Sequence, residues 1–243
     1  MTDFLELPQT PERPVTTALI GEAPDVVMHF LASCGIDLMR LPVNEKISGV
    51  VRTHADANVF HAGDGMIFCD PVMAPVIEPL QPKELHLCTV AGGYPTDCVL
   101  NAAWLGNVVF AHIAALHNEL QRFFLSHEIT LQPVKQGYAR CSVCLVGTHA
   151  IMTEDTGIYQ AAIRCGLDAL LLEKGDIQLS GHPYGFIGGA SAMIAPDTLA
   201  FFGDLSTHRS LAQIRTFLQK HSIQYVDIPG FPLTDIGGIV AIK

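Results

Sequence analysis

Two cysteines three residues apart, Cys141 and Cys144, are the first side chains whose type and spacing could do chemistry. Such a pair can form half of a zinc site, but a structural zinc site takes four ligands and usually a second pair, which this sequence lacks. Redox pairs favour a helix N-terminus, whereas this pair falls in a predicted strand. Residues three apart in a strand point to opposite faces, so we expect Cys144 in the core. Cys141 remains a candidate nucleophile or, alternatively, a small apolar residue at a strand start.

Histidines and carboxylates supply the partners that a nucleophile needs. His54 and Asp56 are separated by one residue, which suits a proton-transferring imidazole beside a carboxylate. The alternative is a histidine in a surface loop. Asp97 and Asp235 follow turns that contain proline or threonine, so each is a candidate for substrate binding or for a turn. His182 lies in a loop rich in glycine and proline, where both roles are equally open.

A repeat of about 45 residues indicates which elements position these side chains. Each copy begins with a strand, a turn marked by Gly, Asp or Pro, and a second strand, usually with an acidic end. These starts are seen at 56–70, 98–112, 141–155 and 190–204. Each copy ends with a helix that leads into a short apolar strand, at 31–42, 123–134, 162–173 and 217–228. The chain therefore predicts a strand–turn–strand–helix–strand unit.

The ends of the predicted helices carry recognisable signals. Gly35 and Gly166 stand where a left-handed C-terminal cap belongs. We expect helices near 113–125, 156–165 and 206–219, the last with Ser206 as its N-cap. The segment after Asp70 is rich in proline, which predicts a short or distorted helix.

The two ends of the chain supply a fifth unit. The C-terminal GGIVAIK predicts a first strand, and the N-terminal TTALIGE predicts a second strand followed by a helix from about Pro24. We therefore expect a five-unit pseudo-symmetric α/β propeller, a ring closed by the N- and C-terminal strands. Residues 16–243 would form this single domain after an N-terminal extension, 1–15. The alternative is a doubly wound α/β domain, which two strands before every helix argue against.

This ring resembles the pentein fold of the guanidino-group-modifying enzymes. These enzymes include arginine and agmatine deiminases, dimethylarginine hydrolases and amidinotransferases, and the chain also resembles an uncharacterised bacterial family assigned to the fold. The family's His-x-Asp motif matches His54-Ala55-Asp56 at the start of the first full unit. Two units later, Gly137-Tyr138-Ala139-Arg140-Cys141 resembles the approach to the family's nucleophilic cysteine, in a circularly permuted order. The family's Phe-x-Arg-Asp and Glu-Gly-Gly-Asp motifs are replaced by residues 181–189 and 233–238.

The resemblance implies roles for these residues. Cys141 would attack the electron-poor carbon of an amidine or guanidine, His54 would transfer a proton to the leaving amine, and Asp56 would orient the histidine. Substrate binding would fall to a further set, made up of Asp97, His182 and Asp235. Because the starts of the first strands should face one central channel, these residues are expected to converge. A nearby histidine would also lower the pKa of Cys141.

The leading hypothesis is thus a Cys-dependent hydrolase or transferase that acts on C–N bonds of a small amidine- or guanidine-like compound. The alternative is a non-catalytic binding protein on the same scaffold, because the pentein fold also hosts a ribosome-binding anti-association factor. A nucleotide- or metal-binding α/β domain follows only if the ring is wrong. Gly188-Gly189 lacks the full phosphate-loop pattern and a following helix, and favours close backbone approach at a strand start.

Composition narrows the partners and the compartment. The chain has 243 residues, of which 49% are hydrophobic and 16% charged, enough apolar material for a large core. Its net charge of -10, with no basic run, argues against nucleic acid. We find neither a signal peptide nor a run of ~18 apolar residues, and we therefore expect no membrane partner. Seven scattered cysteines favour a reducing compartment, hence the cytoplasm. We expect a small-molecule ligand, no metal and no organic cofactor, and the oligomeric state stays open.

Overall fold

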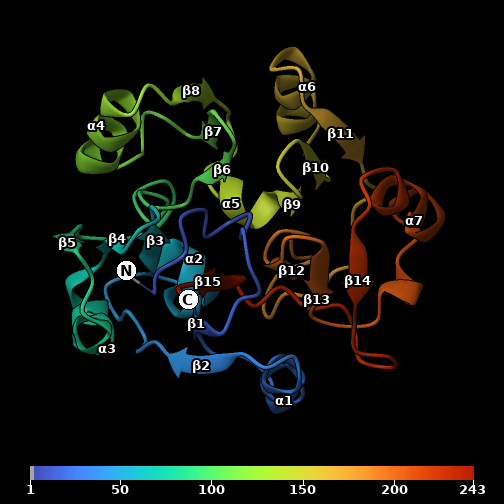
Figure 1. Ribbon diagram of the computed structural model, residues 1–243, viewed down its shortest axis with the longest axis horizontal. Helices are drawn as coiled ribbons and strands as arrows, with labels where there is room; N and C mark the ends of the chain where they lie inside the picture. Colours follow the sequence, from blue (N-terminus) through green and yellow to red (C-terminus); the bar gives the residue numbers. More distant parts are fainter. Residues whose placement is uncertain (1–2) are drawn as a thin grey trace.

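The computed structural model describes residues 3–243 and contains five small three-stranded sheets arranged around a common centre (Figure 1). In every sheet the first and second strands of the unit pair antiparallel, and the second and third pair parallel. The parallel pair is joined by a helix or by a series of short helical turns. The mixed α/β unit predicted from the repeat is therefore present in all five sheets.

The strands and helices are short. The strands are β1 (Thr17–Ile20), β2 (Asp37–Arg40), β3 (Val59–His61), β4 (Met66–Cys69), β5 (Glu84–Leu87), β6 (Ala103–Leu105), β7 (Val108–Ala111), β8 (Thr130–Pro133), β9 (Cys144–Val146), β10 (Ala150–Thr153), β11 (Asp168–Leu171), β12 (Ser191–Ala195), β13 (Thr198–Phe201), β14 (Gln224–Val226) and β15 (Ile239–Ala241). The α-helices are α1 (Asp25–Ser33), α2 (Ala55–Asn58), α3 (Ala74–Ile77), α4 (Asn118–Ser126), α5 (Ala139–Ser142), α6 (Thr156–Arg164) and α7 (Leu211–Lys220). Four 3₁₀ turns complete the set: η1 (Val50–Thr53), η2 (Pro71–Met73), η3 (Glu78–Leu80) and η4 (Leu205–Thr207).

Strands from the two ends of the chain share one sheet. β15 pairs antiparallel with β1, with Ala241 opposite Ala18, and β1 pairs parallel with β2. Within residues 3–243 each sheet stops at three strands, and no continuous sheet runs from one unit into the next. The units are held together by side-chain packing instead.

One apolar cluster lies between each pair of neighbouring sheets. Between the β3–β5 and β6–β8 sheets, for example, the ring of Phe60 packs edge-on against Phe124 with their centroids 5.5 Å apart. Burial of each such side chain contributes about 1.5–3 kcal/mol. β7 and β10 are buried along their whole length, whereas the outer strands β2, β5 and β8 begin and end exposed. Within residues 3–243 no helix is both long enough and apolar enough to cross a membrane.

Each unit ends its helical segment with a residue of positive φ. Gly35 (φ 84°) and Gly166 (φ 77°) hold this position as predicted. Gln81, Glu128 and Ser222, each with φ 57°, hold it in the other three units. A non-glycine residue in this conformation costs roughly 1–2 kcal/mol. Because these three positions carry no glycine, the sequence did not indicate that their φ is positive.

Helix bounds follow the capping residues. α6 begins at Thr156 as predicted, because Asp155 accepts a hydrogen bond from the Ile158 amide at 2.9 Å. The helix expected over 206–219 begins only at Leu211, and Ser206 is not its N-cap. The carboxylate of Asp204 instead accepts from the Ser206 amide at 2.9 Å and caps the separate turn η4.

The segments that carry the candidate catalytic residues were predicted as strand starts, and this was wrong. Asp56 lies in the one-turn helix α2 and Cys141 in the one-turn helix α5, each just before the first strand of its unit. The Asn58 side chain closes the first turn by donating to the His54 carbonyl at 2.9 Å, and the Ser142 amide closes the second on the Tyr138 carbonyl. These local hydrogen bonds hold both segments in helical turns, so each first strand begins later than predicted.

Candidate active site

The helices α2 and α5 bring three chemically reactive side chains together. One ligand-type atom each from His54, Asp56 and Cys141 lies within 4.8 Å of the others, and all three residues are buried. The Cys141 thiol donates to Asp56 Oδ2 at 2.9 Å across a sequence separation of 85 residues. The sulfur therefore faces the carboxylate as well as the imidazole.

Three glycines allow the chain to approach these residues closely. A Cβ on Gly237, whose φ is 73°, would overlap the side chain of His54. A Cβ on Gly188 would overlap the carbonyl oxygens of residues 140, 141 and 143, and one on Gly189 would overlap the carboxylate of Asp235. The close backbone approach predicted for Gly188-Gly189 is thus confirmed, and it seats the segment before β12 against Cys141.

Asn101 connects the reactive groups, and no sequence motif pointed to it. Its Nδ2 donates to Cys141 Sγ at 3.3 Å and to the Asp56 carbonyl at 3.1 Å. Its Oδ1 accepts from the Arg140 amide at 2.7 Å and from the Cys141 amide at 3.4 Å. Asn101 precedes β6 much as Asp56 precedes β3 and Cys141 precedes β9, and this shared place in the repeat is the signal that could have found it.

Asp97 and Asp235 are both buried and are held by hydrogen bonds. Asp97 accepts from the Tyr138 hydroxyl at 2.7 Å and from the Cys98 thiol at 3.3 Å. Asp235 accepts from the amides of Phe186 and Gly237, both at 2.9 Å. A carboxylate offers about four lone-pair positions, so each acid retains acceptor capacity for a cationic ligand. The part played by Tyr138 was not predicted.

A cleft of about 750 Å³ opens above these groups. Five of the six residues singled out from the sequence line it, namely His54, Asp97, Cys141, His182 and Asp235. His182 is exposed, so it stands at the mouth rather than beside the sulfur.

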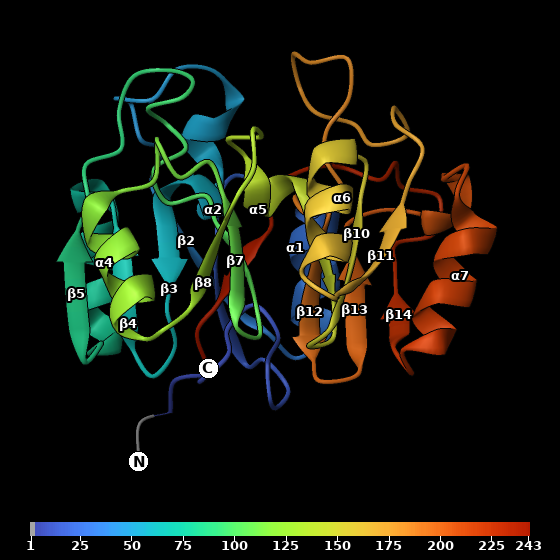
Figure 2. The same cartoon turned by 90° about the horizontal axis from the view of Figure 1, so that it is seen from above.

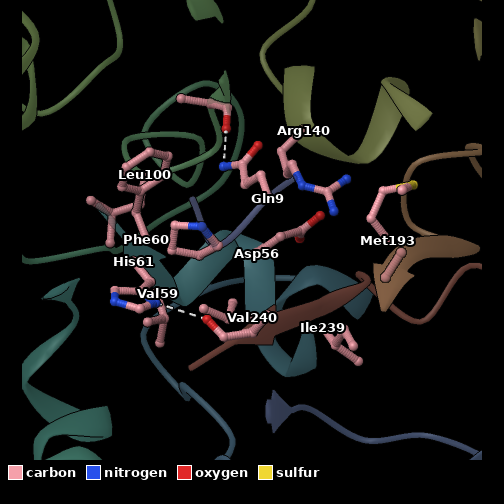
Figure 3. A pocket seen from close by; sticks show the side chains of 14 residues that line it. Gln9, Asp56, Val59, Phe60, His61, Leu100, Arg140, Met193, Ile239 and Val240 are labelled. Carbon is pink, nitrogen blue, oxygen red and sulfur yellow. Dashed lines mark hydrogen bonds between the residues drawn. The ribbon is translucent and has the colours of Figure 1, made fainter. Parts of the chain in front are cut away.

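Asp56 is the sixth residue, and it reaches the other side of the site. With Arg140 it lines a small cavity of about 20 Å³, enough for about one water molecule (Figure 3). Gln9 also lines this cavity, with its amide donating to the Ala102 carbonyl at 3.0 Å. Arg140 is 7% exposed and donates to the Val143 and Gly188 carbonyls. The reactive cluster thus lies between a large cleft and a small cavity.

The electrostatics of the cluster oppose ionisation of the thiol. Burial raises the pKa of Cys141 well above its ordinary value, and the charges of Asp56 and Asp235 raise it further. The predicted lowering of the Cys141 pKa by a histidine is therefore wrong, because burial and, after it, the neighbouring carboxylates favour the protonated thiol. Burial also raises the pKa of Asp56 to about 6, against the opposing charges of His54 and Arg140. These effects favour the neutral thiol of Cys141 over the thiolate.

Glu154 is a further buried acid, which the sequence did not single out. Burial raises its pKa to about 7, and its Oε1 has no hydrogen-bond partner within the described residues. Its Oε2 accepts a long bond, 3.4 Å, from the Ile187 amide. The acidic end noted for the 141–155 unit was the available signal. Such a group can exchange a proton near neutral pH.

Cys144 lies in the apolar cluster between the β9–β11 and β12–β14 sheets, as predicted. Burial raises its pKa to about 12. The only group of three side chains within residues 3–243 that could hold a metal ion is His54, Asp56 and Cys141. Their nitrogen, oxygen and sulfur donors are of the types that zinc accepts.

A family model described as a family of unknown function, DUF6873, matches residues 19–240. The chain belongs to this family. A comparison with the curated proteins found no match.

Several solved structures share the fold. An inosamine-phosphate amidinotransferase from Streptomyces griseus has a TM-score of 0.59 and 11% identity, with 100% of this chain and 96% of that chain covered. The dimethylarginine dimethylaminohydrolase from Pseudomonas aeruginosa, in complex with citrulline, has a TM-score of 0.54 and 8% identity over 93% and 97% of the two chains. A C. jejuni agmatine deiminase with bound substrate has a TM-score of 0.52 and 9% identity over 93% and 90%. The predicted resemblance to the pentein superfamily is confirmed for the fold.

Proposed function

We propose that this protein is an enzyme that uses Cys141 to attack the C–N carbon of a small amidine- or guanidine-like cation. The observation that carries the proposal is the cluster of Cys141, His54 and Asp56 at the base of a cleft that Asp97 and Asp235 also line. These residues come from four of the five units. A cleft that combines a thiol, an imidazole and buried carboxylates suits nucleophilic attack on a cation.

The fold of the solved structures supports this choice of chemistry. The amidinotransferase, the dimethylaminohydrolase and the agmatine deiminase act, by their names, on guanidine-type groups. We infer that residues 16–243 work as one closed ring of five units, as the five clusters between neighbouring sheets support. The free state of all seven cysteines supports work in a reducing compartment such as the cytoplasm.

The neutral thiol determines how the reaction must begin. The same charges that raise the Cys141 pKa, those of Asp56 and Asp235, attract a cation. A guanidinium group that binds between Asp97 and Asp235 offsets this negative field, so the thiol loses its proton more readily once substrate is bound. Arrival of the substrate thereby switches on the nucleophile.

The bond changes then balance as follows. The thiol proton passes to His54, and Sγ forms a bond to the amidine carbon. The C–N bond breaks, the electron pair leaves with nitrogen, and His54 returns its proton to that amine. Water in a hydrolase, or a second amine in a transferase, next adds to the carbon, loses a proton to His54, and expels Sγ, which is reprotonated. The charge of Asp56 attracts that of His54 and holds the imidazole near the sulfur through the first step, and Asn101 donates to the sulfur.

A second candidate is a non-catalytic binding protein for the same kind of cation. The neutral, 1% exposed thiol of Cys141 is the observation that favours it, because a binding site needs no thiolate. Under this proposal the two buried acids alone hold the ligand.

Turnover by matched variants tests the proposal. Amine or ammonia release is measured with a panel of amidines and guanidines for wild type, Cys141→Ala and Cys144→Ala. We expect Cys141→Ala to lose activity by at least about 10³-fold and Cys144→Ala to retain most of it. Full turnover by Cys141→Ala would refute the nucleophile. Since no step uses a metal ion, EDTA is expected to leave turnover unchanged, and loss of turnover on chelation would contradict this mechanism.

A further inference from the structure

The mouth of the cleft is lined by aromatic rings. Tyr94 and Tyr138 lie with ring centroids 5.7 Å apart, and Tyr184 and Phe186 lie 6.4 Å apart. All four residues line the cleft, so three of the chain's five tyrosines gather there. Tyr94 is 56% exposed and Tyr184 is 37% exposed. Large rings left this open at the mouth of a cleft provide apolar area for a ligand.

The two outer rings stand on different loops. Tyr94 belongs to the loop between β5 and β6, and Tyr184 to the loop between β11 and β12. Figure 2 shows both loops rising on the same side of the molecule, above the sheets. A ligand that reaches out of the cleft therefore passes between rings contributed by separate units.

Charge is distributed unevenly along the cleft. The carboxylates Asp97 and Asp235 are 2% and 4% exposed, whereas Lys135 is the one Lys or Arg among the lining residues and is exposed. Asp155, the third acid of the lining, already caps helix α6. The inner cleft thus favours a cation, and it offers no buried cation to pair with a carboxylate on the ligand.

The size of the cleft exceeds what a bare head group fills. Its volume of about 750 Å³ falls within the range of roughly 300–1,000 Å³ that holds drug-sized ligands. A substrate that occupies it must extend from the acids to the tyrosines.

We propose that the substrate is an amidine or guanidine that carries an aromatic or bulky apolar tail and no carboxylate. Its cationic head binds between Asp97 and Asp235, and its tail packs between Tyr94 and Tyr184. This inference rests on the proposed function, because the head group is placed against Cys141. Aromatic contacts of this kind add about 0.5–1.5 kcal/mol beyond area burial, so each ring is expected to matter measurably.

Calorimetric titration of the full-length protein tests the proposal with five probes: guanidine, agmatine, arginine, 3-phenylpropylguanidine and the uncharged 3-phenylpropylurea. We expect the phenylpropylguanidine to bind at least about tenfold more tightly than the other four. Tyr94→Ala and Tyr184→Ala should each weaken its binding about tenfold and leave guanidine binding unchanged. Tyr159→Ala is the matched control, since Tyr159 lies half-buried on α6 and outside the cleft.

Titration of guanidine against Asp97→Asn and Asp235→Asn separates the two levels of failure. If arginine or agmatine binds as tightly as the phenylpropylguanidine, or the tyrosine variants bind it normally, the substrate class is refuted, while weaker guanidine binding by the two Asn variants than by wild type upholds the site. If the urea binds as well as the guanidine, recognition of a cationic head is refuted. If no guanidine binds, or both Asn variants bind guanidine as tightly as wild type, the substrate class and the proposed function both fall.

Discussion

Replacement of Asp56 by Asn is expected to increase the reactivity of Cys141. The Asp56 carboxylate lies 2.9 Å from Sγ, and its charge is, after burial, the largest cause of the raised thiol pKa. Two unit charges about 4 Å apart interact by about 4 kcal/mol at an effective dielectric constant of 20. Asn keeps the shape and removes the charge, so the pKa of Cys141 should fall and its thiolate fraction should rise.

The assay is the rate of iodoacetamide alkylation of each cysteine between pH 6 and 10, followed by peptide mapping. At pH 7.5 we expect Cys141 of Asp56→Asn to react at least about tenfold faster than wild type, since only the thiolate reacts. Cys144 in the same molecule is the internal control, and Asp64→Asn, an exposed acid paired with Lys83, is the control for loss of charge. An unchanged Cys141 profile in Asp56→Asn would refute the argument that this carboxylate suppresses the thiolate.

Three further outcomes follow from the geometry. Glu154→Gln should stabilise the protein at pH 8 by up to roughly 3 kcal/mol but not at pH 4. The folded-state pKa of Glu154 is raised to about 7, so its contribution to the free energy of unfolding is fully present below the ordinary pKa of 4.5 and is lost as the pH rises through 7. Urea denaturation at both pH values checks this, and equal effects would contradict it. Asn101→Ala removes the donor to Sγ and should lower turnover at pH 7 about tenfold, measured as kcat/KM, and a wild-type value would exclude a role for that bond. Gly237→Ala should cost roughly 2–4 kcal/mol in thermal unfolding, more than Gly35→Ala, where a Cβ meets nothing within 4 Å; equal costs would mean that contact with His54 is unimportant.

The repeat and the element order could be predicted because they depend on local patterns. Alternating apolar strands, the glycines at Gly35 and Gly166, and the proline-rich segment after Asp70 each act over a few residues. The same reasoning placed His54, Asp97, Cys141, His182 and Asp235 at comparable points of different units. The structure places all five along one cleft, although their chemical roles remain proposals.

The features that the sequence did not predict depend on contacts between distant residues. The thiol pKa is set by burial and by Asp56, which is 85 residues away, so its direction could not be read from the nearby histidine. Asn101 and Tyr138 act through hydrogen bonds to distant residues, which no local motif indicates, although Asn101 holds the same place in its unit as Asp56 and Cys141. The one-turn helices α2 and α5 replace predicted strand starts because side-chain and turn hydrogen bonds outweigh strand propensity there.

The most direct test of the central claim is mass spectrometry of the protein after rapid acid quench during incubation with 3-phenylpropylguanidine or guanidine. A nucleophilic Cys141 predicts a covalent adduct on the peptide that contains it, formed in wild type and Cys144→Ala and missing in Cys141→Ala. An adduct on another cysteine would contradict the account. Turnover that proceeds without any adduct and persists in Cys141→Ala would contradict it as well.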